Sequence, residues 1–333
     1  MGETQLTRRD FLRAAFGTAA ATLLGATGAA HVFDAPFAGV TELTRGRQTT
    51  LPTRILGRTG ERVSMLALGG DNGLHDPEPA GQAEAIINAA LEHGITYFDS
   101  AREYNFGEVH YGRHLGTRRK KVFLTTKVHA RPYDDAWRSV ETSLRNLQTD
   151  YVDLLQIHHV QDLDDADRVT AKDGSLKAAI EAREQGLARY LGVTGHRDPQ
   201  ALAEMLRRFD FDTILMPMNA ADVHHLPFQG QLIDTALERK MGIINMKVLA
   251  RGALLQGDNA ITMQEAVNYA LTLPVTTAVV GFMNAGQIPR LVEAVRGFRQ
   301  LSADEITALV ERTKPFARTA NFFKRDSDAP WPP

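Results

Sequence analysis

The sequence predicts an α/β protein built on a (β/α)8 TIM barrel, with a short hairpin before the first barrel strand. From Arg54 onward, eight short apolar runs alternate with longer amphipathic segments, as strands and helices alternate in such barrels. The chain of 333 residues is also longer than the roughly 250 residues of a typical barrel. It therefore has room for one barrel and for extensions at its ends.

The eight apolar runs are the expected strands. They are short, contain many β-branched residues and lack strict alternation of apolar and polar positions, which is typical of parallel strands buried on both faces. The runs cover residues 65–68, 96–98, 122–125, 151–157, 190–193, 213–216, 242–246 and 277–280.

Six amphipathic segments predict helices with one apolar face. They cover residues 79–93, 176–185, 199–208, 229–239, 263–271 and 285–297. Gly94, Gly186 and Gly242 each follow one of these segments, and Asp198–Pro199 has the pattern of an N-cap followed by proline in the first turn. A doubly wound sheet is the alternative fold, but no Gly-x-Gly-x-x-Gly motif follows the first run.

The remaining segments complete the predicted organisation. Residues 54–63, with Gly57 and Gly60 as turn residues, predict a hairpin that closes the floor of the barrel. Beyond Leu301 a last helix is followed by Asn321-Phe322-Phe323 and a proline-rich tail. We therefore assign residues 1–40 to a leader with its linker, 41–318 to the barrel and 319–333 to a C-terminal tail.

Composition excludes several kinds of function. The formal net charge is −2, with 38 Lys+Arg against 40 Asp+Glu and no run of basic residues, so neither nucleic acid nor an anionic membrane surface is an expected partner. The chain has no cysteine, which rules out disulfides, thiolate nucleophiles and thiolate metal sites.

The first 40 residues resemble a twin-arginine (Tat) export signal. Arg8-Arg9 lie in the segment Thr-Arg-Arg-Asp-Phe-Leu-Arg, and residues 14–30 are uncharged and mostly small. The resemblance implies export to the periplasm by the Tat machinery, which carries folded proteins, often with a bound cofactor. A chance arginine pair before an amphipathic helix is the alternative. The stretch is too short and too rich in Gly and Thr for stable membrane insertion. Two positions suit cleavage of the signal, one around Ala29-Ala30 and one around Phe37-Ala38.

Polar residues follow three consecutive predicted strands. Asp99 ends the second run, with Tyr104 five residues later; Lys127 follows the third run, and His158 with His159 follows the fourth. Chemistry in these barrels takes place at the C-terminal ends of the strands, so these side chains are expected to meet at one mouth. Singly, each has a structural alternative: a helix cap, a loop aromatic, a rim charge or a buried core histidine.

Together these groups suit the reduction of a carbonyl. A tyrosine, with an ordinary pKa of about 10, is an acid that a nearby lysine cation makes easier to deprotonate. Asp99 would hold Lys127 charged and in place, and His158 would donate a hydrogen bond to the oxygen that becomes negative. Given a hydride donor, Tyr104 would supply the proton.

Five segments resemble signature segments of the aldo/keto reductase superfamily, in the family's order between about Arg54 and Arg296. They cover residues 94–104, 124–127, 151–158, 186–193 and 276–281. The resemblance implies NAD(P)H-dependent reduction of aldehydes or ketones on a (β/α)8 barrel, without a metal. The family's catalytic tetrad falls on Asp99, Tyr104, Lys127 and His158.

The resemblance also implies a cofactor site, in which this chain departs from the family pattern. The usual Ser-Asn after the fifth strand is replaced by Thr194-Gly195-His196, and Asn219 is the amide nearest to the usual Gln of the sixth strand. NADP is preferred over NAD, which is possible, on the basis of Arg290 and of family habit. The further cofactor-binding candidates are Gly70, Lys247, Arg251, Gly252, Gly281 and Gln287, with Lys247 and Arg251 as partners of the pyrophosphate.

The expected substrate is a small carbonyl compound of aromatic or sugar-like character, bound near His159, Phe106, Phe322 and Phe323. One alternative function is a zinc-dependent barrel hydrolase with ligands among His158, His196, His224, His225 and Asp99, although the first strand lacks the usual paired histidines. Another is a non-catalytic nucleotide-binding or regulatory barrel subunit. An exported reductase would also need an electron-transfer partner to reduce its bound cofactor again, unless part of the population stays in the cytoplasm.

Overall fold

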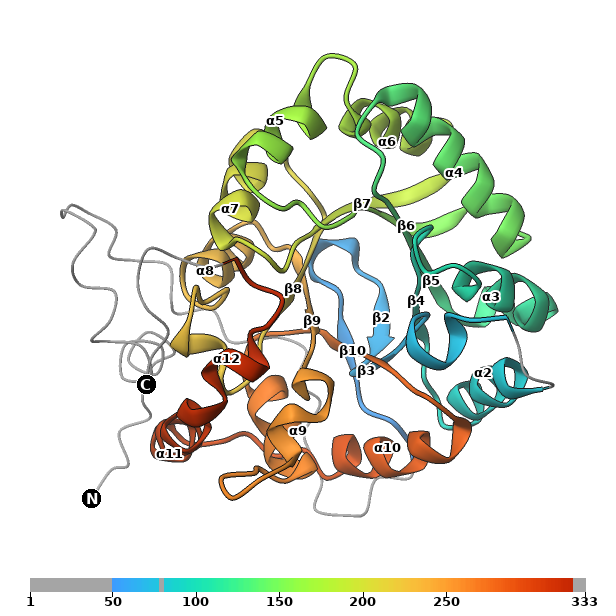
Figure 1. Ribbon diagram of the computed structural model, residues 1–333. Coiled ribbons are helices and arrows are strands. Elements are labelled where there is room, and N and C mark those ends of the chain that lie inside the picture. The colour runs from blue at the N-terminus through green and yellow to red at the C-terminus, as the bar shows by residue number, and fades with distance from the viewer. Residues whose placement is uncertain (1–49, 78–80, 326–333) are drawn as a thin grey trace.

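The computed structural model describes residues 50–77 and 81–325 and contains a closed barrel of eight parallel strands (Figure 1). The strand order around the ring is β10-β3-β4-β5-β6-β7-β8-β9. All eight strands overlap the eight predicted runs, which confirms the predicted fold. Their bounds are β3 (Leu66–Gly69), β4 (Tyr97–Asp99), β5 (Phe123–Val128), β6 (Val152–Ile157), β7 (Ala188–Thr194), β8 (Thr213–Pro217), β9 (Gly242–Met246) and β10 (Thr277–Gly281).

Helices surround the barrel on the outside (Figure 1). They are α2 (Gln82–Glu92), α3 (Gly107–Leu115), α4 (Tyr133–Leu147), α5 (Leu163–Thr170), α6 (Ser175–Glu184), α7 (Pro199–Arg208), α8 (Gln231–Glu238), α9 (Met263–Thr272) and α10 (Ile288–Arg296). Helices α3, α4 and α5 were not among the predicted segments. The inner face of α3 includes Glu108 and His110, so its apolar periodicity is weak. Helix α4, in contrast, buries Ala136, Val140 and Leu147 at helical spacing, a signal that the prediction missed.

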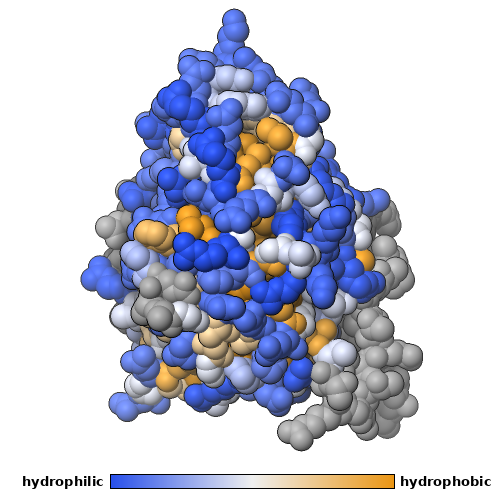
Figure 2. Space-filling view, turned by 90° about the vertical axis from the view of Figure 1, so that its right-hand side faces the viewer, coloured by the Kyte–Doolittle hydropathy of each residue, from blue (hydrophilic) through white to orange (hydrophobic). Residues whose placement is uncertain are grey.

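Hydrophilic side chains cover most of the flank formed by α2, α3 and α4, and apolar groups appear there only as small separate patches (Figure 2). Within the described residues, none of the helices combines the length and the apolar character that crossing a bilayer requires.

A hairpin closes one end of the barrel, as predicted. Strands β1 (Thr53–Ile55) and β2 (Arg62–Ser64) pair antiparallel, and Leu56 and Val63 pack against the side chains that fill the barrel interior. The expected role of Gly242 differs in the structure. Lys240, with φ of +56°, takes the left-handed position after α8, whereas Gly242 lies in β9, where a Cβ atom would come within 2.5 Å of Leu56 Cδ1. Gly242 thus makes room for the hairpin.

Three of the predicted helix boundaries have the expected local chemistry. Gly94 and Gly186 follow α2 and α6 with φ of +82° and +76°, a conformation that glycine adopts without a Cβ penalty. Asp198 caps α7 by accepting a hydrogen bond at 2.9 Å from the backbone N–H of Gln200, and Pro199 occupies the first turn.

The chain beyond the barrel packs against the loop that follows β8. Helix α11 (Ala303–Thr313) is the expected last helix, and α12 (Ala317–Ala320) follows it. Asn321 Nδ2 donates to the carbonyl of Ala221 at 2.8 Å, and His225 and Arg325 are joined through a ring nitrogen and a carbonyl 2.9 Å apart. The expected leader (1–40) and positions 326–333 of the expected tail lie outside the described residues.

Candidate active site

Asp99 and Lys127 form a buried ion pair where β4 and β5 end. The Lys127 ammonium donates to Asp99 Oδ2 and, at 2.7 Å, to the carbonyl of Ser100. The second carboxylate oxygen, Oδ1, accepts from Thr125 Oγ1 at 2.7 Å and from Gln156 Nε2 at 3.2 Å. Burial acts to lower the pKa of Lys127, but the attraction of Asp99 and of Tyr104 outweighs it and raises this pKa. Lys127 therefore remains a cation at neutral pH.

Tyr104 lies next to this cation. The Lys127 Nζ atom is 4.9 Å from the centre of the Tyr104 ring, and the phenol lines the main cavity of the barrel mouth. Burial raises the pKa of Tyr104 above its ordinary value, and the positive charge of Lys127 offsets only part of this rise. The sequence led us to expect the lysine to dominate; instead, desolvation is the larger effect, so Tyr104 is a neutral phenol that can donate a proton.

His158 completes the group from the end of β6. Its ring packs edge-on against Tyr104, with centroids 5.8 Å apart, and its Nδ1 atom lies 2.9 Å from Glu103 Oε2. Burial, followed by the positive charge of Lys127, holds the pKa of His158 well below its ordinary value. The imidazole is therefore neutral at neutral pH.

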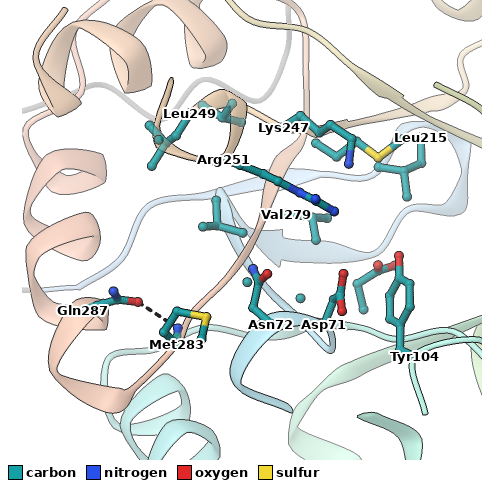
Figure 3. A pocket seen from close by; sticks show the side chains of 17 residues that line it. Asp71, Asn72, Tyr104, Leu215, Lys247, Leu249, Arg251, Val279, Met283 and Gln287 are labelled. Atoms are coloured by element: carbon teal, nitrogen blue, oxygen red, sulfur yellow. Dashed lines mark hydrogen bonds between the residues drawn. The ribbon is translucent and has the colours of Figure 1, made fainter. Parts of the chain in front are cut away.

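A cavity of about 350 Å³ opens beside these side chains at the C-terminal ends of the strands. In Figure 3 the Tyr104 hydroxyl points into the cavity from one side, and Asp71 and Asn72 lie along the cavity wall. Lys247 and Arg251 extend into the cavity from the opposite side. Leu215 and Val279 supply apolar surface. Of the sequence-predicted residues, the cavity wall includes Asp99, Tyr104, Lys247, Arg251, Gly252, Gly281 and Gln287.

The loop after β9 shapes the cationic side of the cavity. Lys247, Ala250 and Arg251 have φ of +55°, +47° and +55°, a region that residues with a Cβ atom seldom adopt, and Gly252 follows with +90°. The carbonyl of Lys247 accepts from Asn219 Nδ2 at 3.2 Å, which ties the loop to the segment after β8. Burial, followed by repulsion from Arg251, lowers the pKa of Lys247 to about 8.

The segment after β7 lies beside this cavity wall. Thr194 Oγ1 accepts from the backbone N–H of His159 at 2.8 Å, and its own hydroxyl hydrogen stays available. A Cβ atom at Gly195 would come within 3.0 Å of Leu202 and of the Val160 carbonyl. The ring of His196 stacks on His159 with centroids 3.9 Å apart, and burial lowers its pKa to about 2.

Three predicted cofactor residues have other surroundings. The Asn219 amide donates to Lys247 and accepts from the N–H of Ala221 at 2.9 Å, so both of its ends are engaged within the protein. Gly70 packs against the end of β4, where a Cβ atom would come within 2.7 Å of Ser100 Oγ. Arg290 is exposed on the first turn of α10 and lies outside the cavity wall.

The predicted substrate residues divide into two groups. His159, His196 and Phe323 form one cluster, in which the Phe323 ring packs edge-on against His196 at 5.8 Å and Lys247 lies 5.3 Å from the Phe323 centroid. Phe322 packs on Phe323 and against Arg251. Phe106, in contrast, is exposed beside His110 and outside the cavity wall.

The histidines of the hydrolase alternative are not brought together. His224 contacts the carbonyl of Val310 at 2.9 Å and His225 contacts that of Arg325, which places both against the C-terminal segment. Within residues 50–77 and 81–325, no group of three or more His, Asp or Glu side chains is arranged to hold a metal ion.

Sequence reasoning missed Glu103, His129 and Gln156. Glu103 directly precedes Tyr104, and Gln156, on β6, lies two positions before His158, so their positions relative to named site residues were available signals. His129 follows β5, and its ring packs edge-on against His158 at 5.7 Å. Since no strand-end motif includes it, only its spatial neighbours reveal it.

The barrel and the polar groups at its mouth define a protein equipped to deliver a proton to a carbonyl oxygen beside a cofactor cavity. Residues 66–266, more than half of the chain, match the model of the aldo/keto reductase family, and the chain belongs to this family. It is therefore an NAD(P)H-dependent oxidoreductase of the carbonyl-reducing class.

Individual relatives agree with this assignment. The chain is 31% identical over 227 residues to the uncharacterized oxidoreductase YrpG of Bacillus subtilis, covering 60% of this chain and 67% of the relative. It is 26% identical over 231 residues to the aldo-keto reductase yakc [NADP(+)] of Schizosaccharomyces pombe, covering 62% and 63%. The structure of aldo-keto reductase AKR11C1 from Bacillus halodurans in its holo form superposes with a TM-score of 0.65 at 25% identity, covering 78% of this chain and 95% of that one.

The residues around the cavity fit a nicotinamide cofactor. Lys247 and Arg251 are two cations on one side, suited to a diphosphate, and Leu215 and Val279 offer apolar surface to an aromatic ring. At Gly281 the backbone itself lines the cavity, and a Cβ atom there would come within 2.4 Å of Asn72 Nδ2 at the tip of that side chain.

Proposed function

We propose that this chain reduces an aldehyde or ketone to the alcohol with Tyr104 as the general acid and NADPH as the preferred cofactor. The observation that carries the proposal is the placement of a neutral Tyr104 phenol at the cavity wall, next to the buried Lys127–Asp99 pair. Bound NADPH supplies the hydride to the carbonyl carbon.

Each residue then has a defined task. Tyr104 holds the proton for the carbonyl oxygen, and Lys127 stabilises the phenolate that remains by electrostatic attraction. Asp99 holds the Lys127 ammonium in place through a direct hydrogen bond. His158, which packs edge-on against Tyr104, offers a second polar group to the carbonyl oxygen. Thr194 offers a hydroxyl to the nicotinamide amide in place of the serine that the family commonly has there.

The preference for NADPH rests on Arg290, whose exposed guanidinium at the start of α10 suits the extra phosphate, and on the likeness to an NADP(+)-dependent relative. The test compares the dissociation constants of NADPH and NADH for the wild type and for Arg290→Gln. Arg290→Gln should weaken NADPH and leave NADH unchanged; an unchanged ratio would refute the role of Arg290.

The substrate proposed is a small carbonyl compound with aromatic or sugar-like groups. Phe322 and Phe323 offer aromatic faces, and the neutral rings of His159 and His196 offer donors and acceptors to hydroxyl groups. Phe106, exposed outside the cavity wall, would contact only the outer end of a longer substrate.

The reductase proposal is tested by fluorescence titration with NADPH, followed by a panel of aldehydes and ketones. Nucleotide binding with turnover that falls at least about 100-fold in Tyr104→Phe supports it. Binding without turnover on any of these substrates favours the alternative of a nucleotide-binding regulatory subunit. Absence of nucleotide binding contradicts the proposed cofactor site.

We further propose that the chain is exported by the Tat machinery to the periplasm, on the basis of the Arg8-Arg9 segment. Fractionation of cells that produce the wild type or the Arg8→Lys/Arg9→Lys variant tests this: the wild type should be periplasmic and the variant cytoplasmic. An electron-transfer partner outside the cytoplasm would then reduce the carried cofactor. If mature protein purified from the periplasm contains no bound nucleotide, the hypothesis of a carried cofactor with an electron-transfer partner is contradicted.

A further inference from the structure

The contact between His158 and Glu103 constrains where the proton of the imidazole lies. His158 Nδ1 is 2.9 Å from Glu103 Oε2, a normal hydrogen-bond distance. An ionised carboxylate only accepts hydrogen bonds, and a neutral imidazole has one N–H. When Glu103 is ionised, the proton of neutral His158 therefore belongs on Nδ1, and Nε2 has a lone pair.

The surroundings fix the ring in this position. The backbone N–H of His158 donates to Val128 at 2.8 Å, and its carbonyl accepts from Arg131 Nη2 at 2.9 Å. The ring packs edge-on against both Tyr104 and His129. His158 is 12% exposed and Glu103 36% exposed, so the pair joins the active site to solvent.

This tautomer conflicts with the task of His158 in carbonyl binding. A carbonyl oxygen is an acceptor, and an Nε2 atom with a lone pair cannot donate to it. One added proton removes the conflict: a solvent proton binds at Nε2, and the Nδ1 proton passes to the Glu103 carboxylate. The net charge of the pair then changes from −1 to 0, and Nε2–H becomes a donor.

The geometry points to Glu103 as a positioning residue that makes carbonyl binding by His158 depend on the uptake of one proton by the Glu103–His158 pair. This inference rests on the proposed reductase function and extends it to a residue next to the general acid. It assigns Glu103 no contact with the substrate.

The charges around the pair favour this location of the proton. Burial, followed by the positive charge of Lys127, lowers the pKa of His158, while burial raises that of Glu103. These opposite shifts favour the Glu103 carboxyl group over an imidazolium as the site of the added proton. The titratable and charged groups that act on the pair are Arg102, Tyr104, Lys127, His129, Arg131 and His159.

The first test measures kcat/KM for carbonyl reduction by the full chain from about pH 5 to about pH 9. We expect kcat/KM of the wild type to fall about tenfold per pH unit above the pKa of the pair. In Glu103→Gln the amide offers a donor to Nδ1 at every pH, so the Nε2–H form no longer requires an added proton and we expect this decline to disappear. The matched control is Glu92→Gln, an exposed carboxylate on α2, which should leave the profile of the wild type unchanged.

A second test reads the tautomer without turnover. Long-range ¹H–¹⁵N spectra of the imidazole rings, with the His158 signals assigned by their loss in His158→Gln, should show the Nδ1–H form in the wild type at high pH and the Nε2–H form in Glu103→Gln. An Nε2–H form in the wild type at high pH, or identical pH profiles for wild type and Glu103→Gln, would overturn the inference. If the wild type reduces no carbonyl substrate, the proposed function is rejected instead, and the spectra alone then decide the tautomer of His158.

Discussion

Lys324 Nζ donates to Asp222 Oδ1 at 2.5 Å, and the two side chains expose 0% and 1% of their surfaces. The same ammonium donates to the carbonyls of Asp222 and His225 at 3.0 and 2.6 Å. This ion pair joins the C-terminal segment to the loop after β8. The segment places Phe322 and Phe323 beside Arg251 and Lys247, so the pair connects the end of the described chain with the active-site mouth.

Replacing Lys324 with Met should lower the free energy of unfolding by about 3–5 kcal/mol, because the Asp222 carboxylate would stay buried without its cation. Burial already raises the pKa of Asp222 and lowers that of Lys324, which indicates that desolvation opposes the charged form of each partner. Urea-induced unfolding measures the effect. The control is Arg207→Gln, which removes an exposed guanidinium paired with Glu204 and should leave the midpoint unchanged. Equal midpoints for wild type and Lys324→Met would contradict this prediction.

Replacing Lys127 with Met should lower kcat by about 100-fold to 10,000-fold, because the Tyr104 phenolate would form without an adjacent cation. Affinity for NADPH should change little, since Lys127 lies outside the cavity wall. Single-turnover measurements of the hydride-transfer step separate the two quantities. Lys172→Met, on an exposed loop, is the control for loss of a lysine. A variant that keeps its kcat but loses nucleotide binding would place Lys127 in the cofactor site instead.

The affinity for NADPH should depend on pH through Lys247, whose pKa lies at about 8. A diphosphate attracts the charged ammonium, so NADPH binds most tightly below about pH 8, and its affinity declines as the pH rises through that value. Lys247→Arg, which stays charged, should remove the decline, and Lys247→Met should be weak at every pH. Titrations at a series of pH values measure the dissociation constants. If the decline in affinity persists in Lys247→Arg, a titrating group other than Lys247 causes it.

Replacing Gly281 with Ala should weaken NADPH binding and destabilise the protein by only about 1 kcal/mol, because the new Cβ atom would come within 2.4 Å of Asn72 Nδ2 and displace that side chain along the cavity wall. The double variant Gly281→Ala/Asn72→Gly removes that contact and should recover most of the loss. Gly286→Ala is the control, since its nearest contact is the exposed Asn284 side chain at 3.2 Å. Thermal unfolding and nucleotide titration measure both effects. If the double variant recovers neither stability nor NADPH affinity, the effect of Gly281→Ala does not come from the contact with Asn72.

The sequence by itself determined the barrel, because each strand and most helices follow from the local spacing of apolar residues. It also placed Asp99, Lys127 and His158 at strand ends, and parallel strands bring their C-terminal ends to one mouth in any barrel of this type. Helices α3, α4 and α5 were not predicted. On α3 the polar side chains of Glu108 and His110 lie on the inner face and weaken the apolar pattern, whereas the apolar face of α4 was present in the sequence and was missed.

Only the tertiary structure decided the electrostatics and the neighbours of the site. Burial outweighs Lys127 at Tyr104, and the amount of burial depends on how distant segments pack. The pairing of Glu103 with His158 joins residues 55 positions apart, and that of Lys324 with Asp222 joins residues 102 positions apart. Local periodicity reports which face of a segment is buried, whereas the partners of a buried charge are set by long-range contacts that form only when the barrel closes.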